Sequence, residues 1–515
     1  MRQCITIFLL IAAMWPGKSG EAMCAPRPER VEDIQMRSLQ SLSYFEKATD
    51  FAFGRSAALY WFRRNYSYTE LDGKIEWRDE QDAYEPAAGE GNLQGSFNVD
   101  SYLRMGEKPV VFGGAEYVTG EKKNVCWNSA SDYQLLYPYV LADSVGGSLR
   151  HEQYRFYGGY ARVDGRFTYG LMASYRALQE YRQTDPRPRN ITGDISADIS
   201  AGWMFDRYVV GLSAGVRIYK QQQSVEFYDA NGANTSELHL TGLGTYYGRY
   251  SGTTYTSVRY RGNGWNASIA IVPENGDGWY AMACYRHMKT DYRLAMINMA
   301  TLTSLQTRNT SIGVAWRKSS GKFGWVLGAT GRYEHRSGEE NIMGSGSSTD
   351  HQPLQGEPMY RRDAGEFQIQ AILEWKGRNA AWNLRPYAGI SFDLERYAYP
   401  ERKMELSHTT AGIAARHLRQ NGKWLWSIEA SGGFSAYTGG EFNIPEVQTD
   451  KRIYAYMSHW YSRHSENATV MGLDMRVQRK ISENMAVFLS AREHLRLFEK
   501  GWKENLMQVA IGICF

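Results

Sequence analysis

The last segment of the chain alternates apolar side chains with polar or small ones, up to a final phenylalanine. Successive side chains of a β-strand point to opposite faces, so alternate residues share one face. One face of this segment would carry Met507, Val509, Ile511, Ile513 and Phe515. The other face would carry Gln508, Ala510, Gly512 and Cys514. The pattern predicts a strand that separates an apolar environment from a more polar one.

The same two-faced pattern recurs from about residue 65 onward, and helical spacing does not return. Three of the clearest apolar faces are Val210, Leu212, Ala214, Val216 and Ile218; Phe367, Ile369, Ala371, Leu373 and Trp375; and Trp382, Leu384, Pro386, Ala388, Ile390, Phe392 and Leu394. The 36 Tyr and 51 Gly residues suit many half-buried strands separated by turns. An all-β fold is therefore predicted, although alternation alone does not distinguish a soluble sandwich from a membrane barrel.

The connections between the predicted strands alternate between short and long. Tight turns are expected near residues 106–109, 163–166, 205–207, 273–277, 318–322, 376–380, 419–423 and 480–483. Long polar stretches lie between them, including 222–252, 340–360 and 439–465. Aromatic residues gather beside the tight turns: Trp203, Phe205, Tyr208, Trp316, Phe323, Trp325, Trp375, Trp382, Trp424 and Trp426. Short turns, long loops and an aromatic belt at one depth are typical of outer-membrane β-barrels.

The N-terminus has the pattern of a secretory signal. Arg2 supplies a positive charge, residues 5–14 form a short apolar core, and a breaker stretch follows at 16–20. We predict a signal peptide over residues 1–22 and a final location in a bacterial outer membrane, surrounded by outer-membrane lipid. A terminal strand that ends on an aromatic residue resembles the strand that the barrel-insertion machinery recognises, so we expect that machinery to bind it.

Counting strands by alternation gives a single transmembrane antiparallel up-and-down β-barrel over residues 65–515, with about 18 strands and a working range of roughly 14 to 20. The predicted strands are 65–77, 92–105, 109–122, 152–163, 166–182, 190–204, 207–221, 253–272, 278–290, 300–317, 322–340, 361–376, 381–397, 403–419, 423–438, 466–480, 484–498 and 503–515. Treating 253–272 as one strand keeps the number even, which is usual for bacterial single-chain barrels.

Residues 23–64 precede the first predicted strand and do not alternate. Val31, Ile34, Leu39, Leu42 and Phe45 fall close to a helical period, with charged residues between them. We predict a short helical or irregular segment in the periplasm or in the lumen. In the lumen it would act as a hatch, whereas a periplasmic arm would block nothing, and the sequence leaves both open.

The polar face of the predicted strands should line the lumen. The lumen-lining residues that we predict are Arg176, Arg217, Glu366, Glu374, Arg385, Asp393, Glu395, Glu429 and Arg492. A barrel of roughly 16–18 strands has an aqueous channel unless something fills it, so the interior should hold water or a plug. Because both charge signs occur, we expect no strong selectivity for one type of ion. Mutual pairing of these charges is the alternative to a role in binding.

No catalytic motif is recognisable, whether a phosphate loop, a G-x-S-x-G elbow, a zinc signature or an EF-hand run. We therefore expect no enzyme activity, no cofactor and no metal. His459 and His464 form the nearest histidine pair and are expected to be solvated in a surface loop. Cys126, Cys284 and Cys514 lie far apart and should pack as small apolar residues. The net charge of +4 is spread along the chain, so nucleic acid is not an expected partner.

Several blocks between residues 54 and 147 resemble a known family. They are Gly54-Arg55-Ser56-Ala57-Ala58-Leu59, Asn65-Tyr66-Ser67-Tyr68, Lys122-Lys123-Asn124-Val125-Cys126-Trp127-Asn128, Ser131-Asp132-Tyr133, Leu135-Leu136-Tyr137-Pro138-Tyr139-Val140 and Asp143-Ser144-Val145-Gly146-Gly147. This family consists of outer-membrane β-barrel proteins of unknown function, so the resemblance implies fold and location but no substrate. A weaker likeness is to long-chain fatty-acid transporters, whose hatch begins with an Asn-Pro pair where this chain has Arg55-Ser56.

Three functional hypotheses remain. We predict first that the barrel passes a small or amphipathic solute through a polar lumen, with the N-terminal segment as a hatch. The alternative is a non-transporting adhesion or assembly protein that binds a surface or lipoprotein partner through its long extracellular loops. Residues 222–252 and 439–465 are rich in Tyr, Gly and Asn, which suits such contacts. The third is a membrane-embedded hydrolase with a Ser, His and Asp cluster at the rim.

Overall fold

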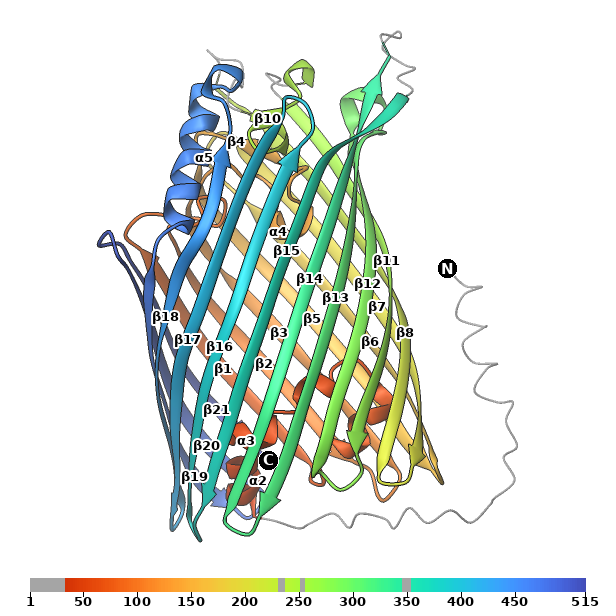
Figure 1. The fold of residues 1–515 in the computed structure, drawn as a ribbon, viewed down its shortest axis with the longest axis vertical. Coiled ribbons are helices and arrows are strands. Elements are labelled where there is room, and N and C mark those ends of the chain that lie inside the picture. The colour runs from red at the N-terminus through yellow and green to blue at the C-terminus, as the bar shows by residue number, and fades with distance from the viewer. Residues whose placement is uncertain (1–32, 230–236, 251–254, 345–352) are drawn as a thin grey trace.

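The protein folds into a closed antiparallel β-barrel, which is apparent in Figure 1. The structure is a computed structural model that describes residues 33–229, 237–250, 255–344 and 353–515. Its 18-stranded sheet consists of β1 (Tyr68–Glu80), β2 (Gly91–Arg104), β3 (Pro109–Val125), β5 (Gly147–Asp164), β6 (Phe167–Tyr181), β7 (Arg187–Phe205), β8 (Tyr208–Glu226), β11 (Tyr255–Pro273), β12 (Gly278–Leu294), β13 (Ala300–Ser320), β14 (Phe323–Met343), β15 (Pro353–Lys376), β16 (Ala380–Tyr397), β17 (Arg402–Asn421), β18 (Trp424–Asn443), β19 (Ala468–Ser482), β20 (Met485–Phe498) and β21 (Lys503–Cys514). The predicted signal peptide, 1–22, lies outside the described residues.

The first and last strands close the barrel. β1 pairs with β21 in a register that runs from Glu70 opposite Cys514 to Glu80 opposite Glu504. The apolar face of β21 is exposed on the outside, with Ile511 at 67%. Cys514, on the opposite face, is fully buried in the interior. The alternation read from the sequence therefore corresponds to a lipid-facing side and an inward-facing side.

The 18 strands match the predicted ones in number and order, and β11 is a single strand as expected. The largest differences lie at the extracellular end, where the strands run beyond the membrane. β15 begins at Pro353, and its register places Glu357 opposite Glu340 of β14. The prediction that 340–360 is entirely loop was wrong, because ladder hydrogen bonding continues past the end of the apolar pattern.

The tight turns lie at one end of the barrel, which also holds the C-terminus (Figure 1). Aromatic side chains surround this periplasmic end on the outside, where Trp203 is 50% exposed and Trp382 is 54% exposed. Trp279 and Trp316 are directly opposite each other in the register, and their rings stack with centroids 5.4 Å apart. These rings form the interfacial belt that the sequence predicts. None of the described helices is long and apolar enough to cross a membrane.

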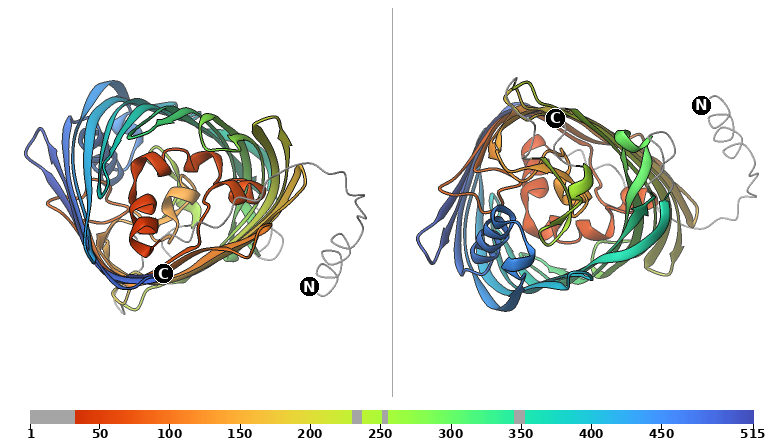
Figure 2. Two further views of the ribbon diagram at one scale, coloured as in Figure 1. Left: turned by 90° about the horizontal axis from the view of Figure 1, so that it is seen from below. Right: turned by 90° about the horizontal axis from the view of Figure 1, so that it is seen from above.

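Residues 33–64, which we call the hatch, fill the periplasmic half of the lumen. Seen from below in Figure 2, their helices lie inside the ring of strands. They form α2 (Ile34–Leu42), α3 (Tyr44–Lys47) and the 3₁₀ helices η1 (Asp50–Ala52) and η2 (Ala57–Phe62). Asp33 caps α2 by accepting from the Gln35 N–H, and Ser43 caps α3 by accepting from the Phe45 N–H. Of the two positions left open by the sequence, residues 33–64 have the lumenal one, and residues 23–32 of the predicted segment lie outside the described residues.

The extracellular half of the lumen is filled by inward-folded loops, residues 126–146 and 237–250, which we call the cap. They contain α4 (Tyr133–Leu136), β4 (Leu141–Asp143), β9 (Glu237–Gly242), β10 (Thr245–Tyr246) and η3 (Gly248–Tyr250). β4, β9 and β10 form a small separate sheet. Beside the cap lies α5 (Lys451–His464), and the remaining 3₁₀ helices are η4 (Ala295–Ile297) and η5 (Glu446–Gln448).

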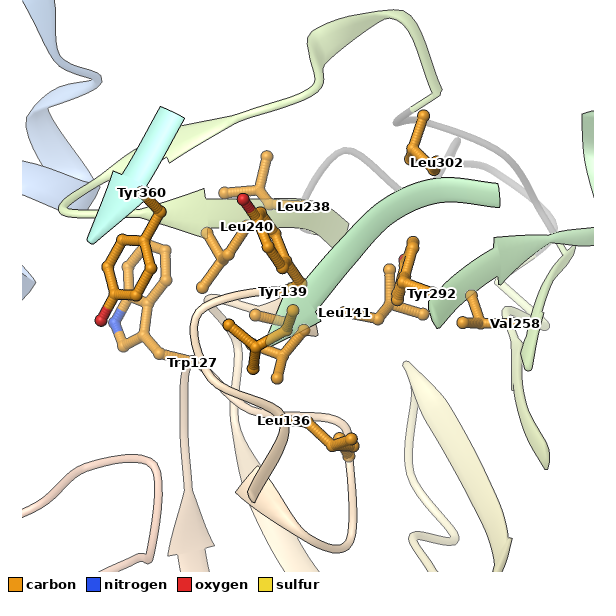
Figure 3. Close-up of a cluster of buried hydrophobic side chains, with 14 of the residues drawn as sticks. Trp127, Leu136, Tyr139, Leu141, Leu238, Leu240, Val258, Tyr292, Leu302 and Tyr360 are labelled. Carbon is orange, nitrogen blue, oxygen red and sulfur yellow. The ribbon is translucent and has the colours of Figure 1, made fainter. Parts of the chain in front are cut away.

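The cap has a hydrophobic core of its own, shown in Figure 3. Leu141 of β4 and Leu238 of β9 pack in one cluster with Tyr292 of the barrel wall. Every residue of β9 is buried. The expectation that 222–252 and 439–465 are surface loops was therefore wrong in part. The first of these ranges contains the buried β9, and the second contains α5, in which Ile453, Tyr456 and Met457 are buried.

Candidate functional site: a chamber between hatch and cap

The hatch meets the barrel wall through polar contacts around the start of α3. The Ser43 hydroxyl donates to Glu374 Oε1 at 2.5 Å, and the Tyr44 backbone N–H donates to Asn383 Oδ1 at 2.6 Å. Glu374 has no exposed surface and also pairs with Lys376 at 2.9 Å. These bonds satisfy a buried carboxylate that would otherwise be costly.

Helix α2 continues the polar contact along β17, β19 and β21. Lys480 pairs with Asp33 at 2.6 Å, and Gln478 Nε2 donates to the Ser38 hydroxyl at 2.8 Å. The same hydroxyl lies 3.6 Å from Cys514 Sγ on the last strand. Gln420 Nε2 donates to the Gln35 side chain at 2.8 Å. Water can replace hydrogen bonds of this kind. Moving α2 off the wall would therefore expose little apolar surface beyond Ile34, which is buried in a cluster with Tyr68 and Cys514.

The other half of the hatch is apolar and packs closely against the wall. In η2, Leu59 and Trp61 are buried in a cluster with Val209 of β8. The wall carries glycine where η2 touches it. A Cβ on Gly211 would lie 2.8 Å from Leu59 Cδ1, and a Cβ on Gly170 would lie 2.7 Å from the Ala58 backbone N. The structure therefore divides the hatch into a polar half, α2, and an apolar half. In the apolar half, Phe45 of α3 packs in the same cluster as Leu59 and Trp61 of η2, which we call the apolar anchor.

Adding one methyl group at this anchor should loosen the hatch. In Gly170→Ala, the new Cβ would collide with the backbone of Ala57 and Ala58, and we expect a cost of about 1–3 kcal/mol. Faster hydrogen exchange of η2 would report it. Gly193→Ala is the matched control on β7, because nothing lies within 4 Å of its Cβ. Equal exchange in both variants would contradict the anchoring role.

A chamber of 440 Å³ lies between the cap, α5 and the wall at the extracellular end. Its lining combines aromatic rings with charged groups. Tyr133 and Tyr137 come from the cap, Tyr456 and Trp460 from α5, and Tyr84 from the loop between β1 and β2. The Tyr133 and Tyr456 hydroxyls are 3.4 Å apart, so cap and helix meet at the chamber. Aromatic surface with a few converging polar groups is typical of sites for small molecules.

Carboxylates outnumber cations in this lining. The charged members are Arg362, Arg496, Glu85, Asp393, Glu395 and Glu466. Arg362 forms a two-pronged ion pair with Asp393 and lies 3.7 Å from Glu395. The Tyr137 hydroxyl donates to Glu395 at 2.9 Å, and Trp460 Nε1 donates to Glu85 at 2.8 Å. Glu466 pairs with Lys500 through one oxygen, whereas its buried Oε2 has no partner among the described residues. The chamber therefore favours a positively charged or hydrogen-bond-donating group.

Glu85 should make the chamber wall sensitive to pH. Burial raises the pKa of Glu85 to about 7 from its ordinary value of 4.5. The folded wall thus binds a proton that the opened loop releases between these values, so stability is full at low pH and falls as pH rises through this window. After division by the intrinsic, base-catalysed exchange rate at each pH, we expect weaker protection of α5 against hydrogen exchange at pH 8 than at pH 5. Glu85→Gln should abolish the difference and stabilise the wall at pH 8 by about 1–3 kcal/mol. Glu90→Gln, in the same loop, should leave it intact, and an unchanged pH response in Glu85→Gln would refute the assignment.

The charged residues that the sequence assigns to the lumen have the following positions. Asp393 and Glu395 line the chamber, while Glu374, Arg385 and Glu429 lie beside the hatch. Arg385 stacks on the Tyr44 ring at 4.6 Å, and Glu429 pairs with Arg416. Arg176 and Arg217 both pair with Asp194, at 3.7 and 2.7 Å, and Arg176 also pairs with Asp132 of the cap at 2.6 Å. Arg492 pairs with Asp474, and Glu366 is opposite Arg332 in the register.

Sequence reasoning missed the aromatic half of the chamber and Arg362. Tyr133, Tyr137 and Trp460 lie in segments without alternation, and no short-range signal shows that these segments meet. His464, expected to be solvated, lies on α5 with its ring stacked on Trp460 at 3.8 Å. Cys126, Cys284 and Cys514 are free thiols. Among the described residues, no three His, Cys, Asp or Glu side chains gather as a metal site would require.

Solved structures with a related shape are outer-membrane receptors and transporters. A mutant of the ferric enterobactin receptor PfeA from Pseudomonas aeruginosa is 8% identical, with a TM-score of 0.36 over 87% of this chain and 80% of that chain. The siderophore receptor PiuA from Acinetobacter baumannii is 8% identical, with a TM-score of 0.38 over 86% and 81%. The copper transporter OprC is 7% identical, with a TM-score of 0.36 over 86% and 80%. At these TM-scores the likeness says nothing about function.

A comparison with curated proteins found no match. The likeness to long-chain fatty-acid transporters stays a prediction. A family model, described as a family of unknown function, matches residues 56–515. The match begins at the η2 anchor of the hatch and includes the cap, α5 and all the strands of the barrel. The chain therefore belongs to the family of unknown function DUF6850.

Proposed function

We propose that this outer-membrane barrel passes a small amphipathic solute, which enters the chamber from the cell surface and leaves past the hatch. The division of the hatch carries this proposal. Its polar half, α2, is held mainly by hydrogen bonds and ion pairs such as Ser38–Gln478 and Asp33–Lys480, which water can replace. Its apolar anchor stays packed against the wall. The hatch is thus suited to swing about η2 without leaving the barrel.

The chamber supplies the chemistry for capture. Tyr133, Tyr137, Tyr456 and Trp460 offer faces on which an apolar or cationic part of a solute can stack. The excess of carboxylates favours a solute with a positive or hydrogen-bond-donating group. At 440 Å³ the chamber is within the usual size of sites for small ligands, roughly 300–1,000 Å³.

Single-channel conductance in a planar bilayer tests the proposal. The full chain should open rarely, and a variant lacking residues 33–64 should carry a steady current. Resistance of the unheated barrel to detergent unfolding confirms that both proteins are folded. Current that rises on deletion supports a hatch-gated pore. No current from either folded protein would contradict transport and favour a surface-binding role.

A further inference from the structure

A row of basic side chains lies on the outer face of the barrel, near its extracellular end. It consists of Lys220 on β8, Arg259 and Arg261 on β11, Lys289 on β12 and Arg308 on β13, which we call the basic arc. All five are exposed. Because side chains alternate along a strand, they share the outward side with Ile218, 44% exposed, and Trp265, 49% exposed. The basic arc therefore faces the surroundings of the barrel and not the lumen.

Positive charges in the basic arc are placed next to one another. The register puts Lys220 directly opposite Arg261, and Arg259 directly opposite Arg293. Like charges directly opposite on neighbouring strands destabilise a sheet. Asp291 is opposite Arg261, but it already pairs with Arg293 at 3.0 Å and accepts from Ser304 at 3.0 Å. Within the described residues, no carboxylate forms an ion pair with any member of the basic arc. The positive charge of the basic arc is therefore available to bind an anion from outside the protein.

Strands farther around the barrel differ. There, two outward-facing basic residues near the same end have carboxylate partners. Arg150 pairs with Glu121 at 3.2 Å, and Lys403 pairs with Glu441 at 2.6 Å and Glu405 at 2.9 Å. The basic arc thus differs from these paired residues, because it gathers uncompensated cations on four neighbouring strands. Arg396 of β16 also has no ion pair among the described residues, but it lies outside the basic arc.

The depth of the basic arc in the membrane follows from strand geometry. On β12, Trp279 belongs to the periplasmic aromatic belt, and Lys289 lies farther along the same strand. At about 3.4 Å per residue and a tilt of about 40°, these ten steps rise about 26 Å. The apolar band of such barrels is about 25 Å tall. Lys289 is therefore at the level where the head groups of the outer leaflet begin.

An apolar groove of 690 Å³ lies on the same outer face, on strands β7, β8, β11 and β12. Its floor is made of small side chains, Ala201, Ala214, Ala267 and Ala283, while Ile199, Leu212 and Ile269 form its ridges. Ala267 and Arg261 are both on β11, six residues apart, so the groove lies below the basic arc within the apolar band. Its surface suits acyl chains.

We propose that the basic arc and this groove together bind an anionic lipid of the outer leaflet that carries phosphate groups and several acyl chains, of the lipid A type. Arg261 and its neighbours hold the phosphates, for which guanidinium groups offer paired donors. The acyl chains lie in the alanine-floored groove beneath. This binding is independent of what passes through the lumen.

The test measures binding of diphosphorylated lipid A to the purified full chain in detergent, by native mass spectrometry. The triple variant Lys220→Gln, Arg261→Gln, Arg308→Gln should bind at least tenfold more weakly. The matched control Arg150→Gln, Lys403→Gln, Lys503→Gln removes the same charge from strands outside the basic arc and should bind as the unaltered protein does. Ala267→Trp, which fills the groove, should also weaken binding with the basic arc intact.

Several outcomes would overturn the proposal. One is undiminished binding in the first triple variant, and another is an equal loss in both triple variants. If the dephosphorylated lipid binds equally well, the acyl chains alone are responsible and the basic arc has no role. If millimolar pyrophosphate displaces the lipid fully, the site takes soluble anions. Unchanged binding in Ala267→Trp would remove the groove from the site.

Discussion

Oxidised Ser38→Cys protein should no longer open, and a reductant should restore its openings. The Ser38 hydroxyl lies 3.6 Å from the free thiol of Cys514, so a cysteine at 38 places two sulfur atoms near bonding distance. The resulting disulfide would tie α2, in the polar half of the hatch, to the last strand of the wall. If the solute passes by movement of α2, conductance events of the full chain should vanish on oxidation.

Two control variants separate the effect of the disulfide from the effect of the substitution itself. Ser41→Cys places a thiol elsewhere on α2, and Ser38→Cys with Cys514→Ala removes the partner. Both should open equally often with oxidant and with reductant. Mass spectrometry confirms the 38–514 bond in the single variant. A confirmed bond that leaves the opening frequency unchanged would show that α2 does not move during conduction.

Asp143→Ala should release the cap from the barrel wall. Asp143 and Arg182 pair at 2.6 Å, and both side chains are fully buried. Asp143 also accepts from the Ser129 hydroxyl and from the backbone N–H groups of Val145 and Gly146. Its removal leaves the buried guanidinium of Arg182 without its ion-pair partner, which lowers stability by about 3–5 kcal/mol. We expect rapid proteolysis within 126–146 and, in the barrel without the hatch, a larger current.

A second substitution distinguishes this ion pair from a simple packing effect. Asp143→Ala combined with Arg182→Met removes both charges, so the double variant should recover much of the protection of the cap against protease. Equal cleavage of the single and the double variant would mean that the cap is held by its hydrophobic cluster alone, and the role of the ion pair would be rejected.

The barrel wall could be predicted because its strands have different environments on their two sides. Lipid on the outside demands apolar residues such as Ile511 and Trp382, while the interior tolerates Gly512 and Asn383. The pattern depends only on residues two apart, so a short stretch of sequence is enough to predict a strand. Strand ends do not follow from this pattern, because β15 continues beyond the membrane, where both faces can be polar.

The cap could not be predicted from alternation, because both faces of its strand β9 are buried. In β9, Glu237 and His239 alternate with Leu238 and Leu240, yet all four are buried because wall and cap surround the strand. His239 is satisfied by the Tyr292 hydroxyl at 2.5 Å. Contacts of this kind join residues far apart in the chain, and a single sequence holds no signal for them.

The chamber could be predicted only in part for the same reason. Asp393 and Glu395 follow from the inward face of β16, but their partner Arg362 does not stand out beside Arg361. Adjacent residues of a strand point to opposite sides, so one of these arginines faces inward and the other outward. The local pattern shows whether a strand side chain points inward or outward. The cap and α5, which complete the site, come from distant parts of the chain.

The pairing of β1 with β21 has a consequence for the order of assembly. The hatch precedes β1 directly, and the first residue of α2 is tied to the turn before β20 by the bond from the Ile34 N–H to the Glu483 carbonyl at 2.9 Å. The seam between β1 and β21 joins the first and last strands of the sheet in chain order. A hatch inside the finished ring must therefore be gathered in while the sheet is still open, or thread in later through the periplasmic mouth. Side chains of α2 that touch β19 and β21 would then guide closure of the seam, so the hatch would act as a template for the barrel during assembly.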